Sequence, residues 1–170
     1  MRQRAADWSV EGLVKGALPT ISAILCVLLA TVPYGVPQLS TVMPWLGIMP
    51  IYYWSIHEPR YLPNWAAFMV GLCQDILTGG PLGLFALIFL LVRHFVTGQR
   101  LLFFKKPFLV GWWGMALVLV LAAAGGWLLA SIYDGMLLPL SPFTVQVVLS
   151  IMIYPLVAWA LGGLWLVVSD

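Results

Sequence analysis

Charged side chains are scarce in this sequence. Eight Lys or Arg and six Asp or Glu make up 8% of its 170 residues, whereas soluble domains contain about 25% charged residues. So few basic residues cannot neutralise a run of phosphates, which argues against nucleic acid as a partner. The shortage of charge also argues against a soluble domain and makes lipid the main solvent of this chain.

Residues from which catalytic and metal sites are built are also few. The chain has two histidines and two cysteines, and it lacks a GxSG-like serine motif, HExxH, a P-loop, a paired-aspartate motif for phosphatidyl transfer and a CxxC pair. Cys26 and Cys73 lie inside apolar runs without a histidine at metal-ligand spacing. We therefore predict a protein with no catalytic, cofactor-binding or metal site, and an intramembrane enzyme is the weakest alternative.

Apolar residues, by contrast, are abundant. They make up 62% of the chain, and the mean hydropathy is +1.01. Six apolar runs are separated by short breaks with Pro, Gly or charge, and about 20 apolar residues suffice for one helical crossing of a bilayer. The runs are Gly16–Val32, Leu39–Ile56, Tyr61–Leu77, Leu82–Val96, Phe108–Tyr133 and Phe143–Val168.

These runs predict an all-α polytopic membrane protein with six transmembrane helices. Residues 1–170 are expected to form a single transmembrane domain, with residues 1–15 as a short cytoplasmic N-terminal segment. The second run is the least regular, because Pro44 and Pro50 are expected to kink it.

The distribution of Lys and Arg tests the six crossings independently, because short cytoplasmic loops are enriched in both. With the N-terminus inside, the outer loops near Val36, Gly80 and Gly135 contain no basic residue. Seven basic residues fall in the inner segments: Arg2, Arg4, Lys15, Arg60, Arg100, Lys105 and Lys106. We therefore predict a multi-pass membrane protein with both termini in the cytoplasm.

Aromatic residues gather near the predicted inner ends of the helices. They are Tyr52, Tyr53, Trp54, Tyr61, Trp65, Trp112 and Trp113. Trp and Tyr are enriched where a membrane meets water, so we expect most of these side chains to form an interfacial belt.

Small residues recur at spacings of four in the last two runs. Ala122, Gly126 and Ala130 form one ridge, and Ala158 and Gly162 form another. Such ridges let helix backbones approach closely in lipid. They are expected either to pack inside this bundle or to meet a helix of a partner, and their spacing does not distinguish the two.

Two charged residues fall within the predicted spans, where an isolated charge is costly. Asp75 lies near the outer end of the third span and Arg93 in the inner half of the fourth. The two side chains could form an ion pair. Alternatively, Arg93 extends towards the inner headgroups, while Asp75 meets water at the outer surface or accepts N–H groups from the Gly79–Gly80 turn or from the start of the fourth span.

The most distinctive stretch is GLCQDILTGGPLGLFAL, residues Gly71–Leu87. Its glycine, the aspartate four residues later and the Gly-rich turn ending in Leu-Gly resemble the central signature of the rod shape-determining protein MreD family. IYYWSIHEPRYLP (Ile51–Pro63) and the basic QRLLFFKKPF (Gln99–Phe108) resemble the segments on either side of that signature, the latter as in alphaproteobacterial members. Together with length and span count, the resemblance covers nearly the whole chain.

This resemblance implies an inner-membrane component of the bacterial cell-elongation complex that helps to direct lateral peptidoglycan synthesis. Its implied partners are an MreC-like bitopic protein and, through the complex, RodA, the transpeptidase partner of RodA and MreB. Six residues are implied to be structural or partner-contact positions: Gly71, Asp75, Gly79, Pro81, Gly83 and Arg93. The family is also similar in fold to the substrate-binding subunits of energy-coupling-factor transporters, which makes a small-molecule (vitamin-like) binding subunit the main rival hypothesis.

Overall fold

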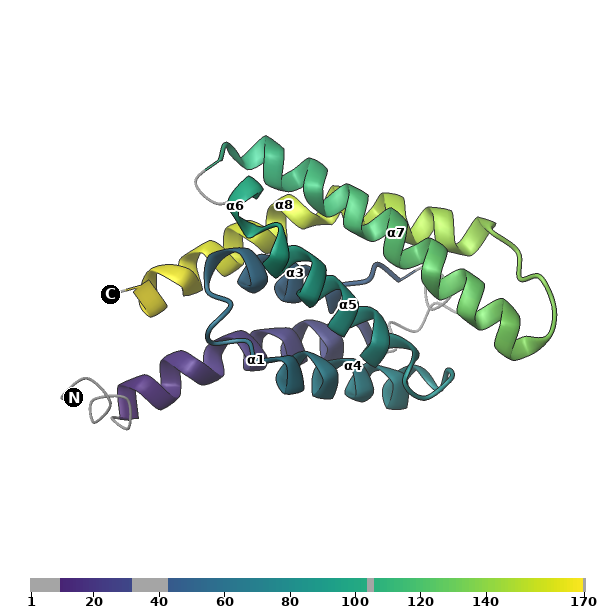
Figure 1. Cartoon of the computed structure of the whole chain (residues 1–170), viewed down its shortest axis with the longest axis horizontal. Helices are drawn as coiled ribbons and strands as arrows, with labels where there is room; N and C mark the ends of the chain where they lie inside the picture. The colour runs from purple at the N-terminus through teal and green to yellow at the C-terminus, as the bar shows by residue number, and fades with distance from the viewer. Residues whose placement is uncertain (1–9, 32–42, 104–105, 170) are drawn as a thin grey trace.

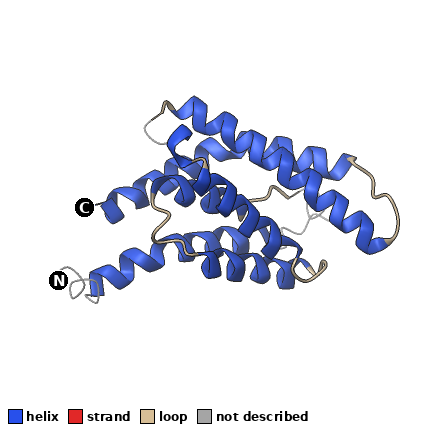
Figure 2. Ribbon diagram, in the orientation of Figure 1, coloured by secondary structure: helices blue, strands red, loops and turns tan. Residues whose placement is uncertain are grey.

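The computed structural model describes residues 10–31, 43–103 and 106–169. Within these ranges the chain is helical and contains no strand (Figure 2). The helices are α1 (Val10–Thr31), α3 (Ile48–His57), α4 (Asn64–Thr78), α5 (Leu84–Gly98), α6 (Arg100–Phe103), α7 (Phe108–Asp134) and α8 (Ser141–Ser169).

The helices run between two ends of the molecule (Figure 1). At one end α1 begins and α8 ends, close to the start of α7. We call this the basic end, because Arg60, Arg100 and Lys106 lie in its loops and in α6. The opposite end, called here the turn end, carries the 79–83 turn between α4 and α5 and the 135–140 loop between α7 and α8.

The two longest helices, α7 and α8, form an antiparallel pair along one side of the molecule (Figure 1). Phe108–Asp134 and Ser141–Leu166 are both long and apolar enough to cross a membrane. At about 1.5 Å per residue, each could span the roughly 30 Å of hydrocarbon in a bilayer. Large apolar side chains such as Trp113, Leu117 and Trp159 are exposed on these helices, as lipid-facing residues would be.

Helix α3 is the centre of the bundle, although it is short. Every residue from Ile48 to Ile56 is buried, and α3 contacts α1, α5 and α8. The sequence predicted one kinked helix over Leu39–Ile56. The structure differs, because the regular helix α3 begins only at Ile48. Pro44 precedes the helix, while Pro50 lies in its first turn, where a missing N–H breaks no intrahelical bond; residues 39–42 lie outside the described ranges.

The aromatic residues of α3 are core residues and do not form an interfacial belt. Tyr52 and Trp54 are fully buried, and Tyr53 is nearly so. The Trp54 indole N–H donates to Ser22 Oγ at 3.0 Å, and the Tyr52 hydroxyl donates to the Gly111 carbonyl at 2.9 Å. The amphipathic rings thus use their polar atoms to connect α3 with α1 and α7 inside the bundle.

Helix α1 begins earlier than the predicted first span. Residues 10–15, part of the expected N-terminal segment 1–15, belong to α1 (Val10–Thr31), and residues 1–9 lie outside the described ranges. The helix continues through Pro19, and the Ser22 hydroxyl donates to the Pro19 carbonyl at 2.8 Å.

The small-residue ridges face the interior of the bundle. A Cβ at Gly126 would lie 3.2 Å from Ile88 Cδ1 and 3.4 Å from Trp45 Cη2, and one at Gly162 would lie 3.7 Å from the Tyr53 hydroxyl. Ala122 and Ala158 are buried as well. Of the two interpretations of these ridges, the structure therefore has internal packing, because small residues allow α7 and α8 to approach α3 and α5.

Candidate functional site

The signature stretch forms a hairpin of α4 and α5 with a tight turn at the turn end. Gly79 ends α4 in a left-handed conformation (φ 68°), and its N–H donates to the Asp75 carbonyl at 3.1 Å. The Pro81 carbonyl then accepts the N–H of Leu84 at 3.2 Å. Gly83 precedes α5 with φ 96°, a conformation that L side chains rarely adopt. Two of the signature glycines thus permit a reversal that other residues would strain.

Asp75 binds the start of α5 with both carboxylate oxygens. One oxygen accepts the N–H of Phe85 at 2.9 Å. The other accepts the N–H groups of Gly83 at 2.9 Å and Ala86 at 3.3 Å. The residue is only 1% exposed, so these bonds and the positive end of the α5 dipole offset the cost of burying its charge.

Gly71 permits the close approach that these bonds require. It lies four residues before Asp75 and therefore on the same face of α4. A Cβ at position 71 would lie 2.5 Å from Ala86 Cα and 2.6 Å from Ala86 N. Because both atoms belong to the backbone, no side-chain movement could relieve the clash. The glycine and the aspartate of the signature thus act on the same contact between α4 and α5.

Arg93 binds the other end of the hairpin. Its guanidinium donates to the Leu62 carbonyl and to Asn64 Oδ1, and at 3.3 Å to the Pro59 carbonyl. These acceptors belong to the loop before α4 and to the first residue of α4 itself. Arg93 therefore holds the α3–α4 loop against α5, at the end opposite to the Asp75 contact.

The ion pair between Asp75 and Arg93, considered as one of two arrangements, is not present. Among the described residues, Arg60 forms an ion pair with Glu58, with 3.2 Å between Nη2 and Oε2. Asp75 has the other arrangement, in which backbone N–H groups at the start of α5 satisfy the carboxylate. The structure thus brings together five signature residues, Gly71, Asp75, Gly79, Pro81 and Gly83, and places Arg93 apart from them.

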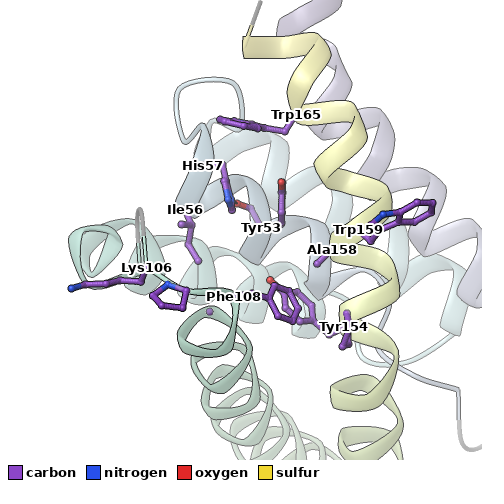
Figure 3. Close-up of a pocket in the computed structure, with 12 residues that line it drawn as sticks. Tyr53, Ile56, His57, Lys106, Phe108, Tyr154, Ala158, Trp159 and Trp165 are labelled. Atoms are coloured by element: carbon purple, nitrogen blue, oxygen red, sulfur yellow. The ribbon is translucent and has the colours of Figure 1, made fainter.

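A hollow of about 670 Å³ lies at the basic end, between α3, the start of α7 and α8 (Figure 3). We call it the basic-end hollow, and its lining includes Tyr53, His57, Lys106, Phe108, Tyr154 and Trp165. His57 Nδ1–H donates to the Tyr53 carbonyl at 2.9 Å, and the two rings stack with centroids 4.1 Å apart. On the opposite wall, Phe108 and Tyr154 stack with their centroids 6.3 Å apart.

The profile of the family described as rod shape-determining protein MreD matches residues 13–161. The chain belongs to the MreD family. The match includes the whole α4–α5 hairpin, Arg93 and all but one of the named residues of the basic-end hollow. No curated protein and no solved structure matches the chain.

Membership of the MreD family gives the chain a role in rod shape determination and associates it with the membrane as part of the shape-determining complex. MreD is not a known family of enzymes. Within the described ranges, no group of three or more His, Cys, Asp or Glu residues could hold a metal ion.

Sequence reasoning missed several polar contacts of this MreD-family chain. Two of the three acceptors of Arg93 are carbonyls of the loop that contains Pro59 and Pro63. Since proline has no backbone N–H, the carbonyls of that loop have fewer local donors. That shortage is visible in the sequence. The contact between the Trp45 N–H and Ser150 Oγ, at 2.9 Å, joins residues 105 positions apart, and no local pattern signals it.

Proposed function

We propose that this protein is a non-catalytic inner-membrane component of the bacterial cell-elongation complex. In this role it helps to maintain rod shape by scaffolding lateral peptidoglycan synthesis together with an MreC-like bitopic protein. Through that complex it associates with RodA, the transpeptidase partner of RodA and the MreB filament.

The proposal rests on the hydrogen bonds of the two charged residues in the α4–α5 hairpin, Asp75 and Arg93. Both oxygens of Asp75 accept backbone N–H groups. Arg93 donates to two carbonyls and one side-chain amide. In a membrane an ionisable residue marks a substrate path or a proton relay when it faces a cavity. Here both charges support the shape of the hairpin instead, which favours a structural role.

We further propose six membrane crossings with both termini in the cytoplasm and one transmembrane domain over residues 1–170. Three described basic residues, Arg60, Arg100 and Lys106, lie at the end where α1 begins and α8 ends, which favours that end for the cytoplasm. The second crossing combines α3 with the non-helical residues 43–47. Irregular backbone is tolerated at membrane depth where protein buries it, and the buried Trp45 N–H bonds to Ser150 Oγ.

The exposed apolar sides of α7 and α8 are among the surfaces available to lipid and to partner helices. Trp113, Val120 and Leu128 are more than half exposed on α7, as are Met152 and Trp159 on α8. The likeness to substrate-binding subunits of energy-coupling-factor transporters stays a prediction.

Copurification tests the scaffold role. The tagged protein is purified from native membranes of a rod-shaped host in a mild detergent, and its partners are identified by mass spectrometry. We expect an MreC-like protein at a constant ratio, absent when another polytopic inner-membrane protein carries the same tag. Depletion of the protein should round the cells, and re-expression should restore rods.

The rival small-molecule binder makes different predictions for the same preparations. A transporter subunit should retain a stoichiometric vitamin-like compound after purification, and its depletion should leave rod shape unchanged. That pair of results would replace the scaffold proposal.

A further inference from the structure

We propose that the basic-end hollow binds one anionic phospholipid of the adjoining leaflet. One acyl chain lies against the stacked rings of Phe108 and Tyr154, and the phosphate faces Lys106. This goes beyond the scaffold role and does not depend on it, because lipid binding is a property of the purified chain. With the proposed topology, the leaflet is the inner one.

The walls of the hollow fit an acyl chain. Phe108, Tyr154, Pro155 and Ala158 contribute apolar surface from α7 and α8, and about 670 Å³ is ample for one chain of an ordinary lipid. Ligand sites of this size are mostly apolar with a few polar groups that fix orientation. Trp159 also borders the hollow and is 80% exposed on the outer side of α8, so the hollow adjoins the surface that lipid covers.

The charge at the rim complements an anionic headgroup. Lys106 is exposed and borders the hollow at the start of α7 (Figure 3). Arg100 and Glu58 act on His57 with opposite sign. The neighbouring acid, Glu58, already pairs with Arg60 at 3.2 Å. The rim therefore presents net positive charge, and basic side chains near a membrane surface attract anionic lipids.

Trp165 lines the hollow together with His57 and Tyr53. The Trp165 indole nitrogen is buried and makes no hydrogen bond to the described residues, although a buried N–H normally has an acceptor. Its ring meets that of His57 edge to face, with centroids 5.9 Å apart, beside the stacked Tyr53 ring (Figure 3). A phosphate or ester oxygen of a lipid is an acceptor of the kind this N–H lacks.

Quenching of tryptophan fluorescence tests the proposal on the purified, delipidated full chain. Phosphatidylglycerol with brominated acyl chains is added in detergent, and phosphatidylcholine with the same chains is the neutral comparison. Because Trp159 and Trp165 border the hollow, bound chains should quench them. We expect saturable quenching at one lipid per chain, with phosphatidylglycerol preferred about fivefold or more, as one basic side chain near the headgroup predicts. Trp159→Phe with Trp165→Phe should remove most of that signal.

Two pairs of variants test separately the charge at the rim of the hollow and the space inside it. Lys106→Gln should abolish the preference for phosphatidylglycerol, while Lys106→Arg, which keeps the positive charge at the same position, should retain it. Gly111→Leu should weaken binding of both lipids, because Gly111 lines the hollow and a Cβ there meets no atom within 4 Å. Gly125→Leu adds the same bulk on the same helix, also without a contact, and should leave binding unchanged.

The proposal is overturned if both lipids quench equally, or if Lys106→Gln and Gly111→Leu bind phosphatidylglycerol like the unaltered protein. Displacement of the lipid by an equal concentration of inorganic phosphate would also contradict it, because the acyl chain is expected to contribute to affinity. Thermal unfolding of each variant is measured in parallel. A variant that unfolds early is replaced by Lys106→Met or Gly111→Val, for which the same outcomes decide.

Discussion

Asp75 and Arg93 lie on the two facing helices of one hairpin, and each binds the beginning of the opposite helix instead of the other side chain. Asp75 on α4 accepts N–H groups at the start of α5. Arg93 on α5 donates to Leu62 and Asn64 at the start of α4. The hairpin is therefore held at both ends by charge-assisted bonds, which are stronger than neutral ones. Two separate contacts make two separate contributions to stability.

Asp75→Asn should lower stability, because an amide offers one acceptor oxygen where the carboxylate has two. Its NH₂ group would also face backbone N–H donors. Leaving a buried donor unsatisfied costs about 1–3 kcal/mol, so thermal unfolding of the detergent-solubilised protein should occur at a lower temperature. Asp134→Asn, the same change at an exposed position at the end of α7, should have little effect. Equal unfolding temperatures for the two variants would contradict the role assigned to Asp75.

Arg93→Gln should also lower stability, because the carbonyls of Pro59 and Leu62 lose their donor. The losses from Asp75→Asn and Arg93→Gln should add to within about 0.5 kcal/mol in the double variant, since the residues share no partner. A double-variant cycle of unfolding free energies measures this. If the double variant loses clearly less than the sum, the two side chains interact and the described arrangement is wrong.

Gly71→Ala should force α4 and α5 apart. The added Cβ would lie 2.5 Å from Ala86 Cα, and overpacking of this kind costs about 1–3 kcal/mol. Gly125→Ala is the matched control inside α7, where a Cβ meets nothing within 4 Å and alanine favours the helix. Unfolding temperature is again the measurement, and the prediction fails if Gly71→Ala is as stable as Gly125→Ala.

Gly83→Ala should strain the turn, even though a Cβ there meets no atom within 4 Å. The backbone has φ 96°, and a left-handed conformation costs an alanine about 1–2 kcal/mol. Gly80 lies in the same turn without positive φ, and its Cβ would make one ordinary contact, 3.9 Å from Thr78 Oγ1. Gly80→Ala should therefore be better tolerated. Comparing the unfolding temperatures of the two variants isolates backbone strain from crowding.

Cysteine labelling tests the six crossings. In a background with Cys26→Ser and Cys73→Ser, single cysteines at Gly80 and Leu137 should react with an impermeant thiol reagent added to intact cells. Leu137 is 82% exposed at the turn end. A cysteine at Gln99, at the basic end, should react only after the membrane is opened. Reaction of the cysteine at position 99 in intact cells would rule out the proposed orientation.

Much of the helical framework could be predicted, because the pattern of apolar runs is local. Helices α4, α5, α7 and α8 occupy four of the six runs to within a few residues. There are two exceptions: the first run, where α1 already begins at Val10, and the second run, where α3 starts only at Ile48. Proline limits which conformations are available near Pro44 and Pro50, but burial between α1, α5 and α8 decides where the regular helix begins.

The sequence pattern alone could not predict whether the aromatic residues of α3 lie at the membrane interface or in the core. Tyr and Trp suit both a membrane interface and a core that satisfies their polar atoms. The choice depended on acceptors far away in the sequence: Ser22 for Trp54 and the Gly111 carbonyl for Tyr52. No local signal identifies such acceptors.

The sequence by itself determined the membrane character, the helical class and the residues of the signature, because hydropathy and turn-forming glycines act over short distances. Only the tertiary structure decided how the two buried charges are satisfied. Asp75 and Arg93 could pair or bind backbone, and both arrangements satisfy the same composition. The choice rested on the close approach at Gly71, which brings the N–H groups at the start of α5 within 3.3 Å of the Asp75 carboxylate. Hydrogen bonds depend on such distances, and distances between helices are a property of the packed bundle.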